Sequence, residues 1–128
     1  MPRGGQSLES AAAEVERIVD LTAAAVLPPG YEIASSTGIN CNPLTAVGGK
    51  QAMSRVDEDL PPETPPPDLD QIEALWRDTF AQRVESLSTR RPSDIWALDL
   101  RLTDGTGLEF QYFVEAHSVH IDGFPRCF

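Results

Sequence analysis

The sequence is short of two things that many functional classes need, positive charge and long apolar runs. Its 128 residues carry 10 Lys and Arg against 20 Asp and Glu, a formal charge of −10 at pH 7. A phosphate backbone or an anionic membrane requires clustered basic side chains, so neither is an expected partner. No segment approaches the ~18 consecutive apolar residues of a membrane span, and residues 1–6 lack the apolar character of a secretory signal. The acidity indicates either plain solubility or a surface that meets a basic protein.

Signatures of catalysis are also missing from the sequence. It contains no GxSxG nucleophile elbow, Walker loop, HExxH zinc motif or dinucleotide fingerprint. The glycines of Gly105-Thr106-Gly107 join two predicted strands, whereas a phosphate cradle joins a strand to a helix. We therefore expect a non-enzymatic domain without a cofactor or a metal site.

Two groups of titratable side chains remain as candidates for chemistry. His117 and His120 are three residues apart, so in an extended strand they point to opposite faces and do not form a metal pair. Asp99, Glu109 and Glu115 are expected to cluster on the outer face of a sheet. Acid–base work needs burial that drives carboxyl pKa values apart, and a solvated face does not supply it. The interpretation is two solvent-facing histidines and a charged exterior.

Cysteine is scarce, with Cys41 in the first half and Cys127 as the penultimate residue. A cysteine so close to a chain end has little core to pack into unless something holds that end down. An even count in a small, proline-rich domain suits a disulfide in an oxidising compartment. The sequence thus predicts a Cys41–Cys127 disulfide, contributing about 4–5 kcal/mol in the chain-entropy model. Two unrelated free thiols are the alternative.

The order of predicted elements indicates one α+β domain over residues 1–128, with residues 1–6 as a disordered tail. Residues 61–67 are proline-rich and predict a semi-rigid spacer between two similar halves. The order is α-β-β, spacer, α-β-β-β. Two helices packed on one face of an antiparallel sheet would bury both apolar stripes. Whether the halves share one continuous sheet is left open.

The first half begins with a helix and continues with two strands. Ser7 or Ser10 is the expected N-cap, and the Pro-Pro-Gly of residues 28–30 stops the helix after Leu27. Alternating patterns then predict strands at Tyr31–Ser35 and Lys50–Val56.

The second half begins with a helix capped by Asp68, with Gln71 three residues on as in a capping box. Its apolar stripe runs to Leu87, and Arg90-Arg91-Pro92 is expected to end it. Alternation and an Asp-Gly turn then predict an antiparallel meander of three strands, at Ile95–Leu102, Leu108–Ala116 and around Val119–Ile121.

Three aromatic residues, Trp76, Phe80 and Tyr112, are candidates for an apolar cleft between the helices and the sheet. Trp76 and Phe80 lie one helical turn apart, a spacing typical of core anchors. The alternative is a small-molecule site, which requires a pocket of ~300 Å³ or more.

Three stretches near the carboxy terminus form a distinctive pattern, Asp104–Phe110, His120–Gly123 and Cys127-Phe128. In the first half, the Leu27–Glu32 segment is followed by a strand and a lone cysteine. Together these stretches resemble small mycobacterial lipoproteins of the LppA type. The resemblance implies an actinobacterial, exported, envelope-facing domain with its cysteines paired. It implies no catalytic residue. The sequence departs from these lipoproteins in having no lipobox leader.

The leading hypothesis is therefore a non-catalytic, secreted or envelope-associated domain of unknown ligand that binds a protein partner, with a basic protein as one candidate. The first alternative is an acidic immunity-type protein that blocks a basic toxin. The charge of −10 and the small size favour this alternative. The second alternative is a small-molecule carrier that uses the aromatic cleft.

Overall fold

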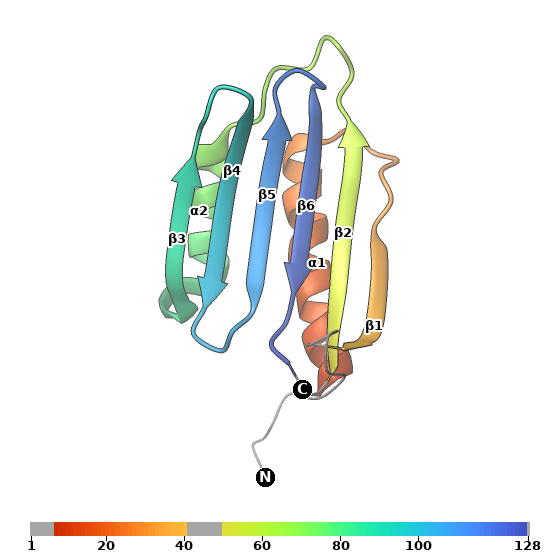
Figure 1. Cartoon of the computed structure of the whole chain (residues 1–128), viewed down its shortest axis with the longest axis vertical. Coiled ribbons are helices and arrows are strands. Elements are labelled where there is room, and N and C mark those ends of the chain that lie inside the picture. The colour runs from red at the N-terminus through yellow and green to blue at the C-terminus, as the bar shows by residue number, and fades with distance from the viewer. Residues whose placement is uncertain (1–6, 41–49, 128) are drawn as a thin grey trace.

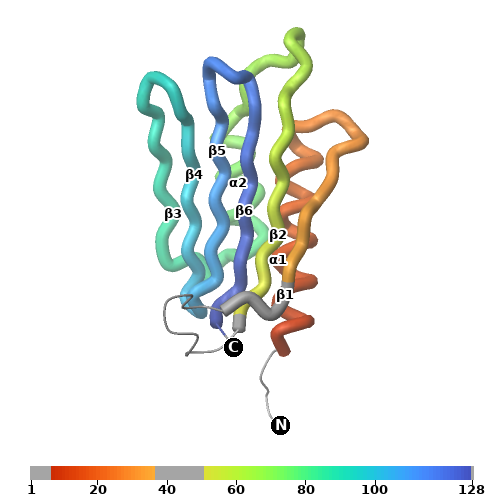
Figure 2. Tube along the Cα trace, turned by 45° about the vertical axis from the view of Figure 1, so that its right-hand side comes forward, coloured from red at the N-terminus to blue at the C-terminus, as the bar shows by residue number. Residues whose placement is uncertain are grey.

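Over the part of the chain that the structure describes, the protein folds as two helices on one face of a six-stranded antiparallel sheet (Figure 1). The computed structural model describes residues 7–40 and 50–127. The strands lie in the order β1-β2-β6-β5-β4-β3. Both helices stay behind the sheet when the view is turned (Figure 2). The elements are α1 (Leu8–Val26), β1 (Ala34–Asn40), β2 (Lys50–Asp59), α2 (Leu69–Phe80), a 3-10 turn (Ala81–Arg83), β3 (Val84–Arg90), β4 (Ile95–Leu102), β5 (Gly107–Phe113) and β6 (Ser118–Phe124).

Helix α1 begins and ends where its sequence predicts. The Ser7 hydroxyl accepts a hydrogen bond from the Ser10 N–H at 3.0 Å, which satisfies one of the free donors of the first turn. The helix ends before Pro28, which cannot continue it. Its buried stripe packs mainly on β2 and β6 and consists of Ala11, Val15, Ile18, Val19, Thr22 and Ala23.

Helix α2 starts as predicted but is shorter than its apolar stripe suggests. The Asp68 carboxylate caps it by accepting from the Asp70 N–H at 3.0 Å. The helix stops at Phe80, and Ala81 adopts a positive φ of 50°. The prediction of helix up to Leu87 is wrong, because residues 84–90 form β3 and pair with β4. Backbone pairing at the sheet edge overrides the local helical spacing.

A buried hydrogen bond joins the two helices. The Trp76 indole N–H donates to the Thr22 hydroxyl at 2.9 Å, and that hydroxyl donates to the Ile18 carbonyl at 2.7 Å. Trp76 and Thr22 are both 0% exposed, and a buried indole N–H without an acceptor is unfavourable. This hydrogen bond therefore fixes the position of the two helices relative to each other on the sheet.

The two halves of the chain share one continuous sheet. Strand β2 of the first half pairs with β6 of the second, with Val56 opposite Ile121. The proline-rich segment runs from β2 to α2 and is fastened to the β5–β6 turn, because the Leu60 N–H donates to the His117 carbonyl at 2.8 Å. Buried apolar residues from both helices and from β2, β4, β5 and β6 form one core cluster, and partly buried Val84 and Leu87 of β3 pack against it.

Close contact between α1 and the sheet depends on a glycine in β6. A methyl group at Gly123 would come within 2.6 Å of Val15, 2.7 Å of Leu108 and 2.8 Å of Val19. These side chains are buried, so any larger residue at this position would push the helix away from the sheet.

The meander β4-β5-β6 agrees closely with its prediction. The Asp104-Gly105 turn has Gly105 at a φ of 95°, which favours glycine, and the Leu102 N–H donates to the Thr106 carbonyl at 2.9 Å. Strand β5 ends at Phe113, earlier than predicted, because the chain turns over residues 114–117 and His117 takes a positive φ of 52°.

Candidate functional site

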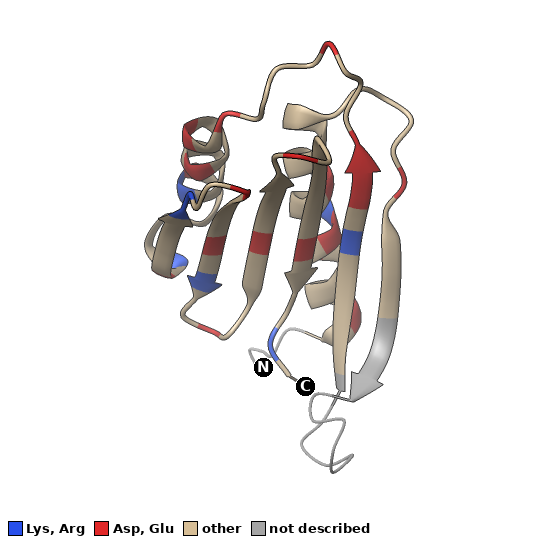
Figure 3. Cartoon of the chain, turned by 45° about the horizontal axis from the view of Figure 1, so that its top comes forward, with Lys and Arg blue, Asp and Glu red and all other residues tan. Residues whose placement is uncertain are grey.

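The candidate site lies on the face of the sheet that points away from both helices, which we call the open face. Side chains alternate along each strand, so every second residue of the meander points there. Asp99 in β4 is directly opposite Glu109 in β5, which is opposite Asp122 in β6. These three carboxylates, the acidic row, cross the middle of the sheet in register (Figure 3).

Arginines neutralise the two ends of the acidic row. Arg90 Nη2 lies 2.8 Å from Asp99 Oδ2, and Arg55 Nε lies 3.0 Å from Asp122 Oδ1. Among the residues that the structure describes, no Arg, Lys or His forms an ion pair with Glu109. Glu109 is therefore the member of the acidic row without an ion-pair partner among these residues.

The environment of Glu109 favours its protonated form. Burial, a hydrogen bond with Asp99 and repulsion by Asp99 and Asp122 raise the pKa of Glu109, while the nearby His120 acts in the opposite direction. Like charges on directly opposed residues of neighbouring strands destabilise a sheet. A positive charge arriving from outside would lower this repulsion.

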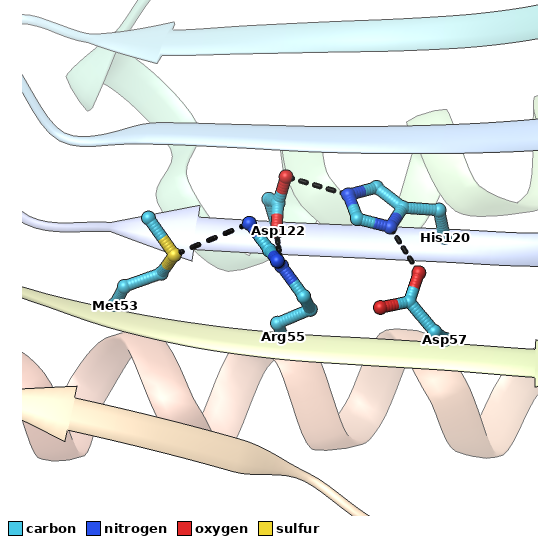
Figure 4. A network of polar contacts seen from close by, with 5 residues as sticks. All are labelled: Met53, Arg55, Asp57, His120 and Asp122. Atoms are coloured by element: carbon cyan, nitrogen blue, oxygen red, sulfur yellow. Dashed lines mark hydrogen bonds and ion pairs between the residues drawn. The ribbon is translucent and has the colours of Figure 1, made fainter.

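His120 joins two carboxylates on the same face. Its Nε2 lies 2.6 Å from Asp122 Oδ2 along β6, and its Nδ1 contacts Asp57 Oδ1 on β2 (Figure 4). Arg55 belongs to the same network, and its Nη2 lies 3.6 Å from Met53 Sδ. Burial lowers the pKa of His120, but the hydrogen bonds to Asp57 and Asp122 outweigh burial and raise it.

A hollow of about 280 Å³ opens beside the acidic row on the open face. Gly107 lies opposite Phe124, and a methyl group at Gly107 would meet Phe124 Cε2 at 2.8 Å. The Phe124 ring therefore lies against the strand at the rim of the hollow. The hollow is lined mainly by Ser86, Ser88, Asp99, Arg101, Glu109 and Phe124.

The structure brings together only part of the predicted acidic cluster. Asp99 and Glu109 are directly opposed as expected, but Glu115 is exposed in the β5–β6 turn and does not join them. Asp122 takes its place. Sequence reasoning missed it, although Asp122 alternates with the inward-facing Ile121 and Gly123.

The two histidines have separate sets of partners, but they do not lie on opposite faces of one strand as predicted, because β6 begins only at Ser118. His117 sits in the β5–β6 turn, with Nδ1 2.7 Å from the Tyr112 hydroxyl and Nε2 3.1 Å from the Pro61 carbonyl. Both rings are partly buried and hydrogen-bonded, so the expectation of two solvent-facing histidines is wrong. Within residues 7–40 and 50–127, no group of three or more His, Cys, Asp or Glu is arranged to hold a metal ion.

The proposed apolar cleft residues occupy the core instead of a surface. Trp76 is 0% exposed, and Phe80 and Tyr112 are each 3% exposed. All three belong to the packed core cluster, and none lines the hollow on the open face. Tyr112 contacts Trp96, with ring centroids 5.2 Å apart.

The structure describes one of the two cysteines of the predicted disulfide. Cys127 is not a free thiol, and Cys41 lies outside the described residues. The pairing of Cys41 with Cys127 stays a prediction. No described helix has the length and apolar character needed to cross a membrane.

Comparisons with known proteins identify a similar fold. No protein-family model matches the chain. No curated protein matches it. The crystal structure of a DUF4853 family protein from Actinomyces odontolyticus is similar, with a TM-score of 0.56 and 12% sequence identity. The similarity covers 98% of this chain and 70% of that one. At this identity it establishes a shared fold.

Proposed function

We propose that the chain is a non-catalytic binding domain that docks a basic protein segment on the open face of its sheet. Glu109 is the observation that carries this proposal. It is the middle member of the acidic row, it lines the hollow, and it has no ion-pair partner among the described residues. A partner's cationic side chain in the hollow would compensate this charge and relieve the repulsion along the row.

The arrangement of charge on the open face favours a defined docking position over diffuse attraction. Asp99 and Asp122 are already paired with arginines, so within the acidic row Glu109 is the member that a partner's cation can pair with. The Phe124 ring and the hydroxyls of Ser86 and Ser88 add an aromatic edge and hydrogen-bonding groups around the hollow. Arginine suits such a site because its guanidinium is planar, weakly hydrated and able to bind a carboxylate through two N–H groups.

We place this domain outside the cytoplasm, secreted or associated with the cell envelope. The support is the even number of cysteines, the absence of a free thiol at Cys127 and the resemblance to actinobacterial lipoproteins. The charge of −10 makes nucleic acids and anionic lipid surfaces poor partners.

Peptide binding tests the proposed docking site. The probe is an unstructured octapeptide with three arginines, and its control is the same peptide with citrulline, a neutral isostere of arginine. Binding is measured by fluorescence anisotropy at about 20 mM and about 500 mM salt, since added salt screens exposed charges. We expect binding of the arginine peptide that weakens with salt, and little binding of the citrulline peptide.

A matched pair of variants separates a site from general acidity. Glu109→Gln and Glu115→Gln remove the same charge, but Glu115 lies in the exposed turn away from the row. We expect Glu109→Gln to weaken peptide binding at least fivefold and Glu115→Gln less than twofold, because short-range charge pairs are worth more than distant ones. Equal loss in both variants, or no binding by the native protein, would refute the docking site.

An acidic immunity-type protein is the second candidate function. The high negative charge and small size favour it, and the open face would then cover the basic surface of a toxin. Co-expression with basic toxins encoded beside the gene would test it, with survival as the readout and Glu109→Gln as the variant. The carrier hypothesis gains no support, because Trp76, Phe80 and Tyr112 fill the core.

A further inference from the structure

His120 is held in a way that makes its contacts depend on its charge. Its two ring nitrogens face carboxylate oxygens of Asp57 and Asp122. A neutral imidazole has one N–H and one lone pair, so only the imidazolium can donate to both carboxylates. His117 differs, since its partners are a hydroxyl and a carbonyl, which one N–H and one lone pair satisfy together.

The charged groups around His120 come from β2, β5 and β6. Arg55 and Asp57 face it from β2, and Asp122 faces it from its own strand. From β5, Gln111 is directly opposite, and Glu109 is close enough for the two charges to interact. Helix α1 lies on the other face of the sheet (Figure 1), and within the described residues the hydrogen-bond partners of His120 are Asp57 and Asp122.

We propose that His120 is a proton-operated gate on the docking face: the imidazolium occupies Asp57 and Asp122, and losing its proton frees a carboxylate for the cationic partner. This inference rests on the proposed function. The bond broken is the N–H of one ring nitrogen, and the proton goes to solvent. Deprotonation also removes a positive charge from beside Glu109, so a basic partner binds more tightly above the titration than below it.

Glu109 of the acidic row also titrates, and its ionisation changes the affinity for a basic partner in the same direction as deprotonation of His120. The pKa of Glu109 is raised by burial and by its contacts with Asp99 and Asp122, and that of His120 is raised because its carboxylate partners outweigh burial. As pH rises through both pKa values, His120 loses its positive charge and Glu109 gains a negative one, so the net charge of the open face becomes more negative at each step. An arginine-bearing ligand is therefore held weakly in acid and firmly at neutral to alkaline pH.

The test measures affinity for the arginine octapeptide between about pH 5.5 and about pH 8, a range that spans histidine titration. For the native protein we expect binding to tighten about three- to tenfold across it, the effect of changing one or two charges near the ligand. His120→Gln should lose most of this dependence. His117→Gln is the matched control and should keep it, because His117 lies in the turn and not on the open face.

The outcomes separate the gate from the docking site. An unchanged pH dependence in His120→Gln overturns the gate and leaves the docking site standing, whereas no peptide binding at any pH overturns both. NMR titration of the two histidine rings provides a readout that does not depend on peptide. His120 should titrate above the ordinary histidine range, and lower after Asp57→Asn. A native His120 that titrates at or below the ordinary value overturns the gate.

Discussion

Replacing Glu109 with glutamine should stabilise the fold, although the same change is expected to weaken binding. The substitution removes the central charge of the acidic row, which faces Asp99 on one side and Asp122 on the other. It preserves the shape of the side chain, and the new amide N–H can donate to the Asp99 carboxylate. A binding residue that lowers stability is common, because a site prepared for a ligand is not optimised for the unliganded fold.

The magnitude follows from the register of the strands. A directly opposed cross-strand pair contributes about 0.2–1 kcal/mol, and like charges make that contribution unfavourable. Glu109 has two such neighbours, and both are partly compensated by arginines. We expect Glu109→Gln to raise the free energy of unfolding by about 0.5–1.5 kcal/mol near neutral pH, or the Tm by about 2–5 °C.

Urea and thermal unfolding measure this effect, with pH and salt as internal checks. The pKa of Glu109 is higher in the fold than in the unfolded chain, so its ionisation costs the native protein stability as pH rises through that value. The gain in the free energy of unfolding caused by Glu109→Gln should therefore be largest near neutral pH and vanish in acid. It should also shrink at about 1 M salt, where the Debye length is about 3 Å.

The matched control is Glu115→Gln, which makes the same charge change in the exposed β5–β6 turn. We expect it to stay within about 0.5 kcal/mol of the native protein, as surface substitutions usually do. If both variants gain the same stability, relief of net charge explains the gain and the acidic row is not strained. A Glu109→Gln variant less stable than the native protein would also refute the reasoning.

The fold and the disulfide give three further predictions. Thr22→Val leaves the buried indole N–H of Trp76 without its acceptor, so we expect a loss of about 1–3 kcal/mol by urea unfolding, while Thr22→Ser should lose clearly less. Gly123→Ala places a methyl group within 2.8 Å of three side chains; it should cost about 1–3 kcal/mol, and an unchanged unfolding midpoint would contradict the close contact of α1 with the sheet. Intact-mass and thiol counts without reductant should find Cys41 and Cys127 both blocked and the mass two hydrogens short; two reactive thiols would count against an extracytoplasmic location.

The local parts of the fold could be predicted because local interactions decide them. Ser7 and Asp68 mark the helix starts, since a side chain there satisfies backbone groups within three residues. The Asp104-Gly105 turn determines the hairpin register and with it the facing of Asp99 and Glu109. One side of the candidate site was therefore predictable from a short stretch of sequence.

Other parts depended on long-range pairing that no local pattern encodes. Residues 84–90 have a helix-like apolar spacing at their start, but they form β3 because their backbone pairs with the edge of β4. Glu115 falls out of the predicted cluster because the chain turns after Phe113.

The sequence by itself determined the helix caps, the hairpin and the acidic balance, because each depends on neighbours a few residues away or on composition alone. The tertiary structure decided the site. His120 meets Asp57, and Arg55 meets Asp122, only because β2 pairs with β6 across more than sixty residues of chain. That pairing arises from burying two apolar strand faces under one helix, a global requirement that alternation within either strand does not reveal.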